Sequence, residues 1–457
     1  MPNQMKTKTM ILTEGKPVNL ILQFAIPIFL GRLFQIFYSL VDTKIVGSIL
    51  GETALASVGS VSTLYNLMTG FFNGLSLGFS VITARYYGSG EEKAVKRSVA
   101  SAILLGFLTA AILVTGVALF LSEIVEVLHV PQEQKAMALS YIQILIWGMF
   151  ITLAYNLCAN ILRAIGDSMT PLLFLILSAF LNVILDYVFI LQFHMGVGGA
   201  AWATVLSQLL SVVLCLLRIW RDFPILHVSL EDFRLDKSRA VVMYQSGLSM
   251  GLMSSLVNFG TLTLQSGINQ LGTNIIVAHT AARKVFEIWN LPISVLGSAM
   301  ATYCGQNYGA KKYDRIRQGV KSALLLGGGW AVVIFVLAHT ISPYLIRFIA
   351  STTQEDIIYW GTTYLETDMS FLIVCILIVV LRNSMQGFGD CVTPIVSSFI
   401  ELVGKLVFTF VFVKIFGYWG IIWTEPIIWF FMVIPLIIMT LRNPIFLNKG
   451  RVDCGKK

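Results

Sequence analysis

Two short stretches of this chain decide its fold: residues 166–171 read Gly-Asp-Ser-Met-Thr-Pro, and residues 389–394 read Gly-Asp-Cys-Val-Thr-Pro. Further landmarks recur outward from them at nearly the same spacing: Leu50-Gly51 as Leu271-Gly272, Tyr87-Gly88 as Tyr308-Gly309, and Gly196, Gly199 and Trp202 as Gly417, Gly420 and Trp423. Such constant spacing implies few insertions or deletions. The sequence therefore contains two copies of one unit.

The composition assigns both copies to the membrane. Hydrophobic residues make up 56% of the 457 and charged residues only 12%, far below the charged fraction of a soluble domain. Long apolar stretches cover about residues 18–46, 54–84, 98–121, 136–158, 171–192, 198–217, 241–268, 275–303, 319–340, 358–381, 394–413 and 418–441. Each reaches the roughly 20 residues that a helix needs to cross the hydrocarbon core. We therefore predict an all-α integral membrane protein with twelve transmembrane helices.

Six spans per copy mean that both copies enter the membrane from the same side, as parallel repeats. Such repeats are typical of secondary transporters, whose two halves rock around a site between them. We predict an N-terminal six-helix lobe over residues 1–217, a cytoplasmic linker over 218–240 and a C-terminal six-helix lobe over 241–457. The two bundles are expected to be pseudo-symmetric and to surround a central cavity.

Lysine and arginine residues predict the orientation. Placing both termini in the cytoplasm puts 24 of the 32 in cytoplasmic segments and four outside, and this bias decides the topology. The remaining four lie within spans: Arg32, Arg283, Lys284 and Lys405. The bias also accounts for the net charge of +8 without a nucleic-acid partner. The six cysteines show no paired or metal-ligand spacing, so we expect no cofactor.

Buried polar residues in the first copy predict a coupling site. An aspartate at the bilayer centre costs about 2.5–3.5 kcal/mol on insertion scales, so such residues are expected to face an interior. Asp42 lies on the first span and Asp186 on the fifth, where Ser178, Asn182 and Asp186 share a helix face at i, i+4, i+8. Helical rise places these residues, together with Thr204, in the outer half of the membrane.

Two carboxylates, an amide oxygen and a hydroxyl at one depth form an all-oxygen set. Such a set suits a hard cation such as Na⁺, and two nearby carboxylates in low dielectric equally favour holding a proton. The alternative is structural: Asn182 and Asp186 satisfy each other between packed helices. We predict that Asp42, Asn182, Asp186 and Thr204 bind the coupling ion, either H⁺ or Na⁺.

The second copy does not repeat this set. By the repeat spacing, the four positions become Thr263, Lys405, Thr409 and Glu425. Glu401 precedes Lys405 by four residues, an order that favours a self-neutralising pair on a helix. Coupling is therefore expected in the first copy only.

Other charged residues of the second copy define a candidate substrate cavity: His279, Arg283, Glu287 and Asp368. The first three share one helix face. They either touch substrate and relay protons or form internal ion pairs that shape the bundle, and the sequence favours neither interpretation.

Pro27 is expected to kink the first span, which also carries Asp42. The kink either transmits ion binding or simply eases packing.

One motif suggests an enzyme. Gly387-Phe388-Gly389-Asp390 matches the GxGD signature of intramembrane aspartyl proteases. However, the repeat assigns Asp390 and Asp167 to cytoplasmic turns, with Thr170 and Thr393 as expected N-caps before proline. We therefore predict that the protein is not an enzyme.

As an ordered set, several motifs resemble the multidrug and toxic compound extrusion (MATE) family over nearly the whole chain. They are Ala25-Ile26-Pro27, Val41-Asp42, Val46-Gly47, Asn182-xxx-Asp186-xx-Phe189, residues 198–204, residues 305–310 and the two Gly-Asp-xx-Thr-Pro turns. The resemblance implies efflux of amphipathic, often cationic organic compounds, driven by Na⁺ or H⁺ entry. The family's first-lobe site maps onto Asp42, Asn182, Asp186 and Thr204.

Residues 254–258 contain no acid, so the chain looks more like the DinF-like branch than the branch with a glutamate there. The resemblance implies a multi-pass protein of the bacterial plasma membrane, which we expect to be a monomer whose partners are small organic substrates and the lipid bilayer. The main alternative is a flippase for a lipid-linked saccharide on the same superfamily fold. For that activity several basic residues would be expected to line the cavity. A non-transporting receptor or scaffold is a third class.

Overall fold

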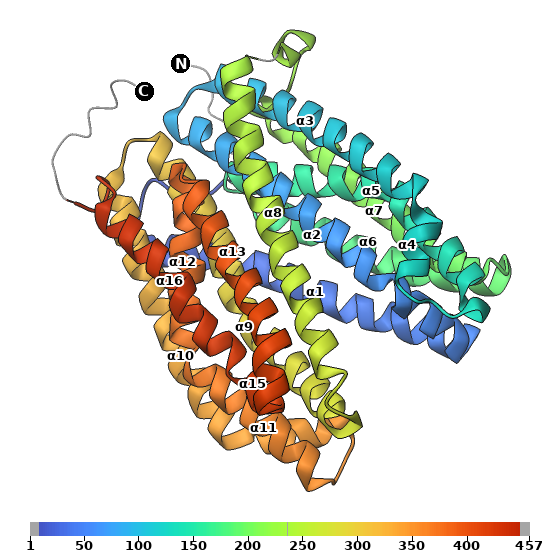
Figure 1. Cartoon of the computed structure of the whole chain (residues 1–457). Helices are drawn as coiled ribbons and strands as arrows, with labels where there is room; N and C mark the ends of the chain where they lie inside the picture. Colours follow the sequence, from blue (N-terminus) through green and yellow to red (C-terminus); the bar gives the residue numbers. More distant parts are fainter. Residues whose placement is uncertain (1–8, 235, 448–457) are drawn as a thin grey trace. The chain divides into compact units, whose positions relative to one another are not determined.

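The computed structural model describes residues 9–234 and 236–447, and its regular elements in this part of the chain are all helical (Figure 1). The first copy contains α1 (Pro17–Leu50), α2 (Glu52–Ser89), α3 (Glu92–Leu119), the short α4 (Leu121–Val127), α5 (Gln132–Ala164), α6 (Met169–Tyr187), the π-helical turn η1 (Val188–Gln192) and α7 (Gly196–Asp222). Two 3₁₀ turns follow, η2 (Pro224–Leu226) and η3 (Leu230–Phe233).

The second copy repeats the pattern with more interruptions. It contains α8 (Lys237–Ile268), α9 (Thr273–Gly309), α10 (Tyr313–Ala350), α11 (Glu355–Ser370), α12 (Leu372–Phe388), α13 (Val392–Val407), the π-helical turn η4 (Phe408–Phe412), α14 (Val413–Phe416), α15 (Tyr418–Ile422) and α16 (Thr424–Arg442). The π-helical turns follow equivalent helices, α6 and α13, so this local widening belongs to both copies. Such turns are frequent near functional sites.

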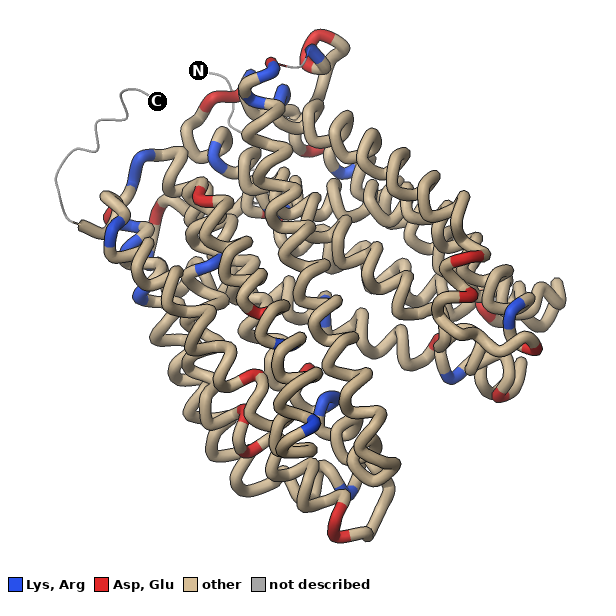
Figure 2. The backbone as a smooth tube through the Cα atoms, in the orientation of Figure 1, with Lys and Arg blue, Asp and Glu red and all other residues tan. Residues whose placement is uncertain are grey.

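The predicted architecture of twelve spans is confirmed. Nine helices among the described residues are long and apolar enough to cross a membrane, and α11 with α12 forms a tenth span, bent by 52°. Segment α9 and the segment from α13 to α14 complete the set of twelve. Their apolar character is weaker because charged residues lie inside them, among them Arg283 and Lys405. Figure 2 shows that most other charged residues lie at helix ends.

The helices form two compact units. Among the described residues, the first unit comprises residues 9–11, 23–234 and 236–251, and the second comprises residues 12–22 and 252–447. Helix α1 therefore begins in the second unit and continues in the first, and α8 is divided between the two units in the same way.

Three of the glycine pairs that recur in both copies lie at helix ends with a positive φ angle. Positive φ angles occur at three equivalent pairs: Gly51 (86°) and Gly272 (95°), Gly166 (93°) and Gly389 (108°), and Gly196 (58°) and Gly417 (57°). Residues with a Cβ rarely adopt this conformation. The duplication therefore preserved the turns because their backbone requires glycine.

The recurring aspartates cap the helices that follow these turns. Asp167 accepts hydrogen bonds from the backbone N–H of Thr170 (3.0 Å) and from its hydroxyl (2.6 Å), and Asp390 accepts the same two bonds from Thr393 at the same distances. The expectation that Thr170 and Thr393 are N-caps was wrong, since α6 and α13 already begin at Met169 and Val392. The turn role of both aspartates is confirmed.

The N-terminal segment packs within the second unit. Leu12 is completely buried, and its backbone N–H donates to Gln306 Oε1 at 3.1 Å. Its carbonyl accepts from Asn307 Nδ2 at 3.2 Å and from Arg315 at 3.3 Å. Arg315 also donates to the carbonyl of Gly15 at 2.9 Å. The Gln306-Asn307 part of the family motif therefore anchors the chain just before α1.

The aspartate caps give a stability prediction. Asp390→Ala removes both acceptors that Thr393 uses, and loss of such a cap typically costs about 0.5–2 kcal/mol of unfolding free energy. Asp390→Asn keeps one acceptor oxygen and is expected to lose less. Thermal unfolding of the purified protein in detergent measures both variants. An unchanged melting temperature for Asp390→Ala would contradict the capping role.

Candidate functional site

The structure brings the four predicted coupling residues into one region of the first unit. Asp42 lies on α1, Asn182 and Asp186 lie on α6, and Thr204 lies on α7. Asp186 is 0% exposed and Asn182 is 2% exposed, whereas Asp42 and Thr204 are half-buried. The spacing of Ser178, Asn182 and Asp186 does place all three on the buried face of α6, as predicted.

The carboxyl groups of Asp42 and Asp186 form the centre of this region. They approach each other within hydrogen-bonding range, so one shared proton is enough to join them. As two ionised carboxylates, however, neither can donate to the other. In that state one oxygen of Asp42, both oxygens of Asp186 and both amide atoms of Asn182 are buried without a hydrogen-bond partner.

These buried polar atoms without hydrogen-bond partners indicate what the site can bind. Buried polar groups in native proteins nearly always have a partner, and leaving one unpaired costs about 1–3 kcal/mol. Carboxylate and amide oxygens together can bind a hard cation, and the carboxyl pair alone can bind a proton. The Thr204 hydroxyl donates to the carbonyl of Ala200 at 3.1 Å, which leaves its oxygen lone pairs available to a cation.

Sequence reasoning missed the aromatic side chains around the pair. Tyr141 on α5 is nearly buried and interacts electrostatically with both Asp42 and Asp186, and Tyr65 on α2 interacts with Asp42. Tyrosines are common in apolar helices, and their spacing carries no signal that would have linked them to the aspartates. Only the folded chain, which brings Tyr65 and Tyr141 near the aspartates, reveals them.

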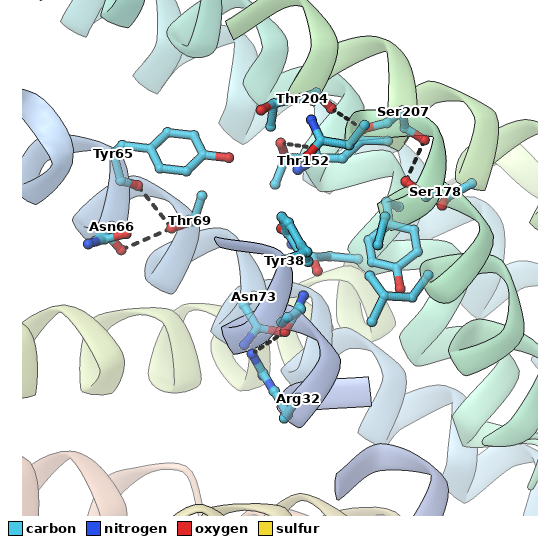
Figure 3. A pocket seen from close by; sticks show the side chains of 18 of the residues that line it. Arg32, Tyr38, Tyr65, Asn66, Thr69, Asn73, Thr152, Ser178, Thr204 and Ser207 are labelled. Atoms are coloured by element: carbon cyan, nitrogen blue, oxygen red, sulfur yellow. Dashed lines mark hydrogen bonds between the residues drawn. The ribbon is translucent and has the colours of Figure 1, made fainter. Parts of the chain in front are cut away.

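A polar cavity of about 320 Å³ lies next to this site in the first unit. Asn182 and Thr204 are among its lining residues, and Figure 3 shows polar side chains converging on it from several helices. Ser178 donates to the carbonyl of Ser207 at 2.7 Å, and Thr152 donates to Gln208 Oε1 at 2.7 Å. These bonds hold the helices α5, α6 and α7 that form the wall.

The buried charges of the second unit form a chain of ion pairs. Lys405 Nζ lies 2.8 Å from Glu401 Oε1 and 3.4 Å from Glu425 Oε1, which confirms the predicted pair of Glu401 with Lys405. The chain extends at one end to Arg283, 3.6 Å from Glu425, and at the other to Arg382, 4.0 Å from Glu401.

Lys405 places a positive charge at the position that corresponds to Asn182 of the first unit. The repeat spacing aligns Lys405 with Asn182 and Glu425 with Thr204. An equivalent contact supports this alignment: the Ser211 hydroxyl donates to the carbonyl of Phe174 in one unit, and the Ser397 hydroxyl donates to that of Met432 in the other. The second unit thus has an ammonium group where the first has a neutral amide.

The four candidate cavity residues of the second unit occupy different environments. His279 is buried, with Nδ1 3.1 Å from the Tyr418 hydroxyl, and Arg283 donates to the Tyr364 hydroxyl at 3.4 Å. Glu287 is exposed, although it was expected on the same face as both. Asp368 is completely buried, and both of its oxygens lack a hydrogen-bond partner.

Pro27 lies inside α1, which continues as one helix from Pro17 to Leu50. The kink at this position and its effect on Asp42 stay predictions. Pro27 also lines a small recess of about 30 Å³ on the same side of α1 as Arg32.

Comparison with known proteins places these features in a family. A model of the MatE family matches residues 27–188 and 250–411, one segment in each copy. The chain is 26% identical to the probable multidrug resistance protein YpnP of Bacillus subtilis over 89% of this chain and 90% of that protein. It is 22% identical to the multidrug export protein MepA of Staphylococcus aureus, covering 92% and 93%.

A solved structure shares the fold. The crystal structure of MATE in the bent conformation superimposes with a TM-score of 0.86 at 21% sequence identity, covering 93% of this chain and 96% of the other.

The ion-pair chain gives a stability prediction for the second unit. Lys405→Met leaves Glu401 and Glu425 without the ammonium that contacts both, and removing one partner of a buried pair typically costs about 3–5 kcal/mol. Lys414→Met removes an exposed lysine of the same unit outside the predicted span, where substitutions usually change stability by about 0.5 kcal/mol or less. Melting temperatures in detergent compare the two. Equal melting temperatures would contradict a structural role of these ion pairs.

Proposed function

We propose that this chain, which belongs to the MatE family, is a secondary antiporter that exports amphipathic organic compounds in exchange for inward H⁺ or Na⁺. The relatives YpnP and MepA, described as multidrug resistance and export proteins, support organic efflux as the function. The excess of lysine and arginine in the segments assigned to the cytoplasm supports a cytoplasmic position for both termini. The same relatives support a location in the bacterial plasma membrane. Absence of an acid in residues 254–258 supports the DinF-like branch.

The observation that carries the coupling proposal is the group of buried atoms without partners on Asp42, Asn182 and Asp186. A proton shared by the carboxyl pair, or a Na⁺ bound by the same oxygens, supplies the missing interaction and neutralises repulsion between the carboxylates. The site therefore favours an occupied state whenever the ion is available.

Ion binding drives export if the two conformations of the protein bind the ion unequally, because a ligand shifts an equilibrium only by its difference in affinity. Asp42 and Asp186 lie on different helices, α1 and α6. Occupancy draws these helices together, and loss of the ion lets the carboxylates repel each other. Asn182 and Thr204 connect the ion site to the cavity, because both line its wall. A compound in the cavity therefore responds to the ion through shared helices.

The size of the cavity supports small compounds as substrates. Sites for drug-sized ligands typically measure about 300–1,000 Å³, and the first-unit cavity measures about 320 Å³. A lipid-linked saccharide needs a larger and more basic space. The flippase alternative therefore has less support than efflux of small organic compounds.

The coupling proposal predicts that Asp42→Asn and Asp186→Asn reduce ion-driven efflux to the level of protein-free liposomes. Each substitution removes a carboxylate that the cation or proton requires while keeping the size of the side chain. Efflux of a fluorescent dye from proteoliposomes is measured under a Na⁺ gradient and under a pH gradient, each applied separately. The gradient that drives wild-type efflux identifies the ion.

Asp314→Asn serves as the matched control because Asp314 is an exposed acid at the start of α10, paired with Arg317. It is expected to keep wild-type efflux. Wild-type rates in Asp42→Asn or Asp186→Asn, with the protein incorporated at equal density, would refute the assignment of the ion site.

A further inference from the structure

Two arginines in the interior of the first unit lack an acidic partner. Arg32 on α1 donates one hydrogen bond, to Gln35 Oε1 at 3.4 Å, and Arg163 on α5 donates to Asn160 Oδ1 at 3.0 Å. Arg163 Nε is buried without any partner. Among the described residues, neither guanidinium has a carboxylate within 4.0 Å.

The second unit treats its interior cations differently. Arg283, Arg382 and Lys405 each have a glutamate within 4.0 Å, as described above. A cation within a membrane segment is expensive unless an anion or a water-filled cavity compensates it. Arg32, which lies within a span, therefore lacks the compensation that glutamates supply to the cations of the second unit.

Arg32 faces the polar cavity. Figure 3 shows its side chain at the cavity wall beside Asn73, opposite the side formed by Thr152 and Thr204. Arg32 and Arg163 also line the smaller recess of about 30 Å³, which shares Gln35, Asn73 and Tyr155 with the cavity wall. The two guanidinium groups thus border one continuous set of polar residues.

The acids of the coupling site do not serve as the missing partners. Asp42 is ten residues from Arg32 on α1, a rise of roughly 15 Å along the helix. Asp42 and Asp186 instead face each other, and the residues that line the cavity include neither of them. The cavity wall therefore presents a guanidinium and neutral polar groups without a carboxylate.

We propose that this cavity binds the carboxylate of an amphipathic organic compound, with Arg32 as the residue that recognises it and Arg163 as a second positive charge behind it. A planar guanidinium can donate two parallel hydrogen bonds to a carboxylate, and Gln35 and Asn73 offer further donors at the same wall. The inference rests on the proposed export function and narrows its substrates to compounds that bear an acid group, including zwitterions.

The test compares two dyes that differ only in this group. Rhodamine B carries a free carboxylate on a cationic ring system, and its ethyl ester lacks that negative charge. Binding of each to the purified full-length protein in a neutral detergent is followed by fluorescence anisotropy. The wild type is expected to bind the acid more tightly. Arg32→Gln is expected to weaken binding of the acid roughly tenfold or more, the usual effect of losing a charged hydrogen bond, and to change binding of the ester little.

Two further variants keep the test decisive. Arg32→Lys retains the charge but not the planar donor pair, so it is expected to bind the acid with intermediate affinity. Lys414→Gln removes an exposed lysine of the second unit outside the predicted spans and is expected to leave both affinities unchanged. Monodisperse elution and an unchanged melting temperature establish that Arg32→Gln is folded. If it does not fold, Arg163→Gln and the wild-type preference for the acid provide the comparison.

Equal wild-type affinity for acid and ester, or equal weakening of both in folded Arg32→Gln, would overturn the proposal. Displacement of the acid by micelles containing phosphatidylglycerol but not phosphatidylcholine would also overturn it, because the anion would then come from a lipid headgroup. No ion gradient is present in this assay. Failure of antiport in proteoliposomes is therefore distinguishable from failure of carboxylate binding.

Discussion

Repulsion between the Asp42 and Asp186 carboxylates is the constraint on which the first lobe depends. Asp186 is buried and Asp42 half-buried, and no described lysine, arginine or histidine forms an ion pair with either of them. Under the proposed function, a mobile positive charge neutralises this pair when it binds between α1 and α6. Tyrosines lie near this pair, and the polar cavity lies beside it. Under the proposed function, the ion site is therefore next to the space for the organic compound.

The two lobes handle buried charge in opposite ways. The first keeps its acids and its arginines apart, with Asp42 and Asp186 in one place and Arg32 with Arg163 in another. The second joins its charges in a continuous chain through Lys405. Separated charges need external partners, whereas paired charges do not. Under the proposed function, the first lobe exchanges ligands, whereas the buried charges of the second lobe are already neutralised by one another.

Much of this organisation follows from residues that the sequence displays directly. Apolar stretches predicted the spans, and repeated glycines predicted turns because positive φ excludes most side chains. The buried face of α6 followed from helical spacing. Other features became visible only in the structure. The sequence around Tyr141 has no periodicity that links it to the aspartates. The bend at Phe371 divides a segment that the sequence predicts as one span. Glu287 shared a predicted face with Arg283, yet neighbouring helices cover only the arginine.

Lys405 also bears on the history of the duplication. A dissolved cation leaves its ligands when its concentration falls, but an ammonium tethered by a side chain stays at a fixed local concentration. At one position of the repeat the first copy has Asn182 and the second has Lys405, whose ammonium group lies beside Glu401 and Glu425. Under the proposed function, the same position therefore meets a dissolved ion in one copy and a tethered ammonium in the other.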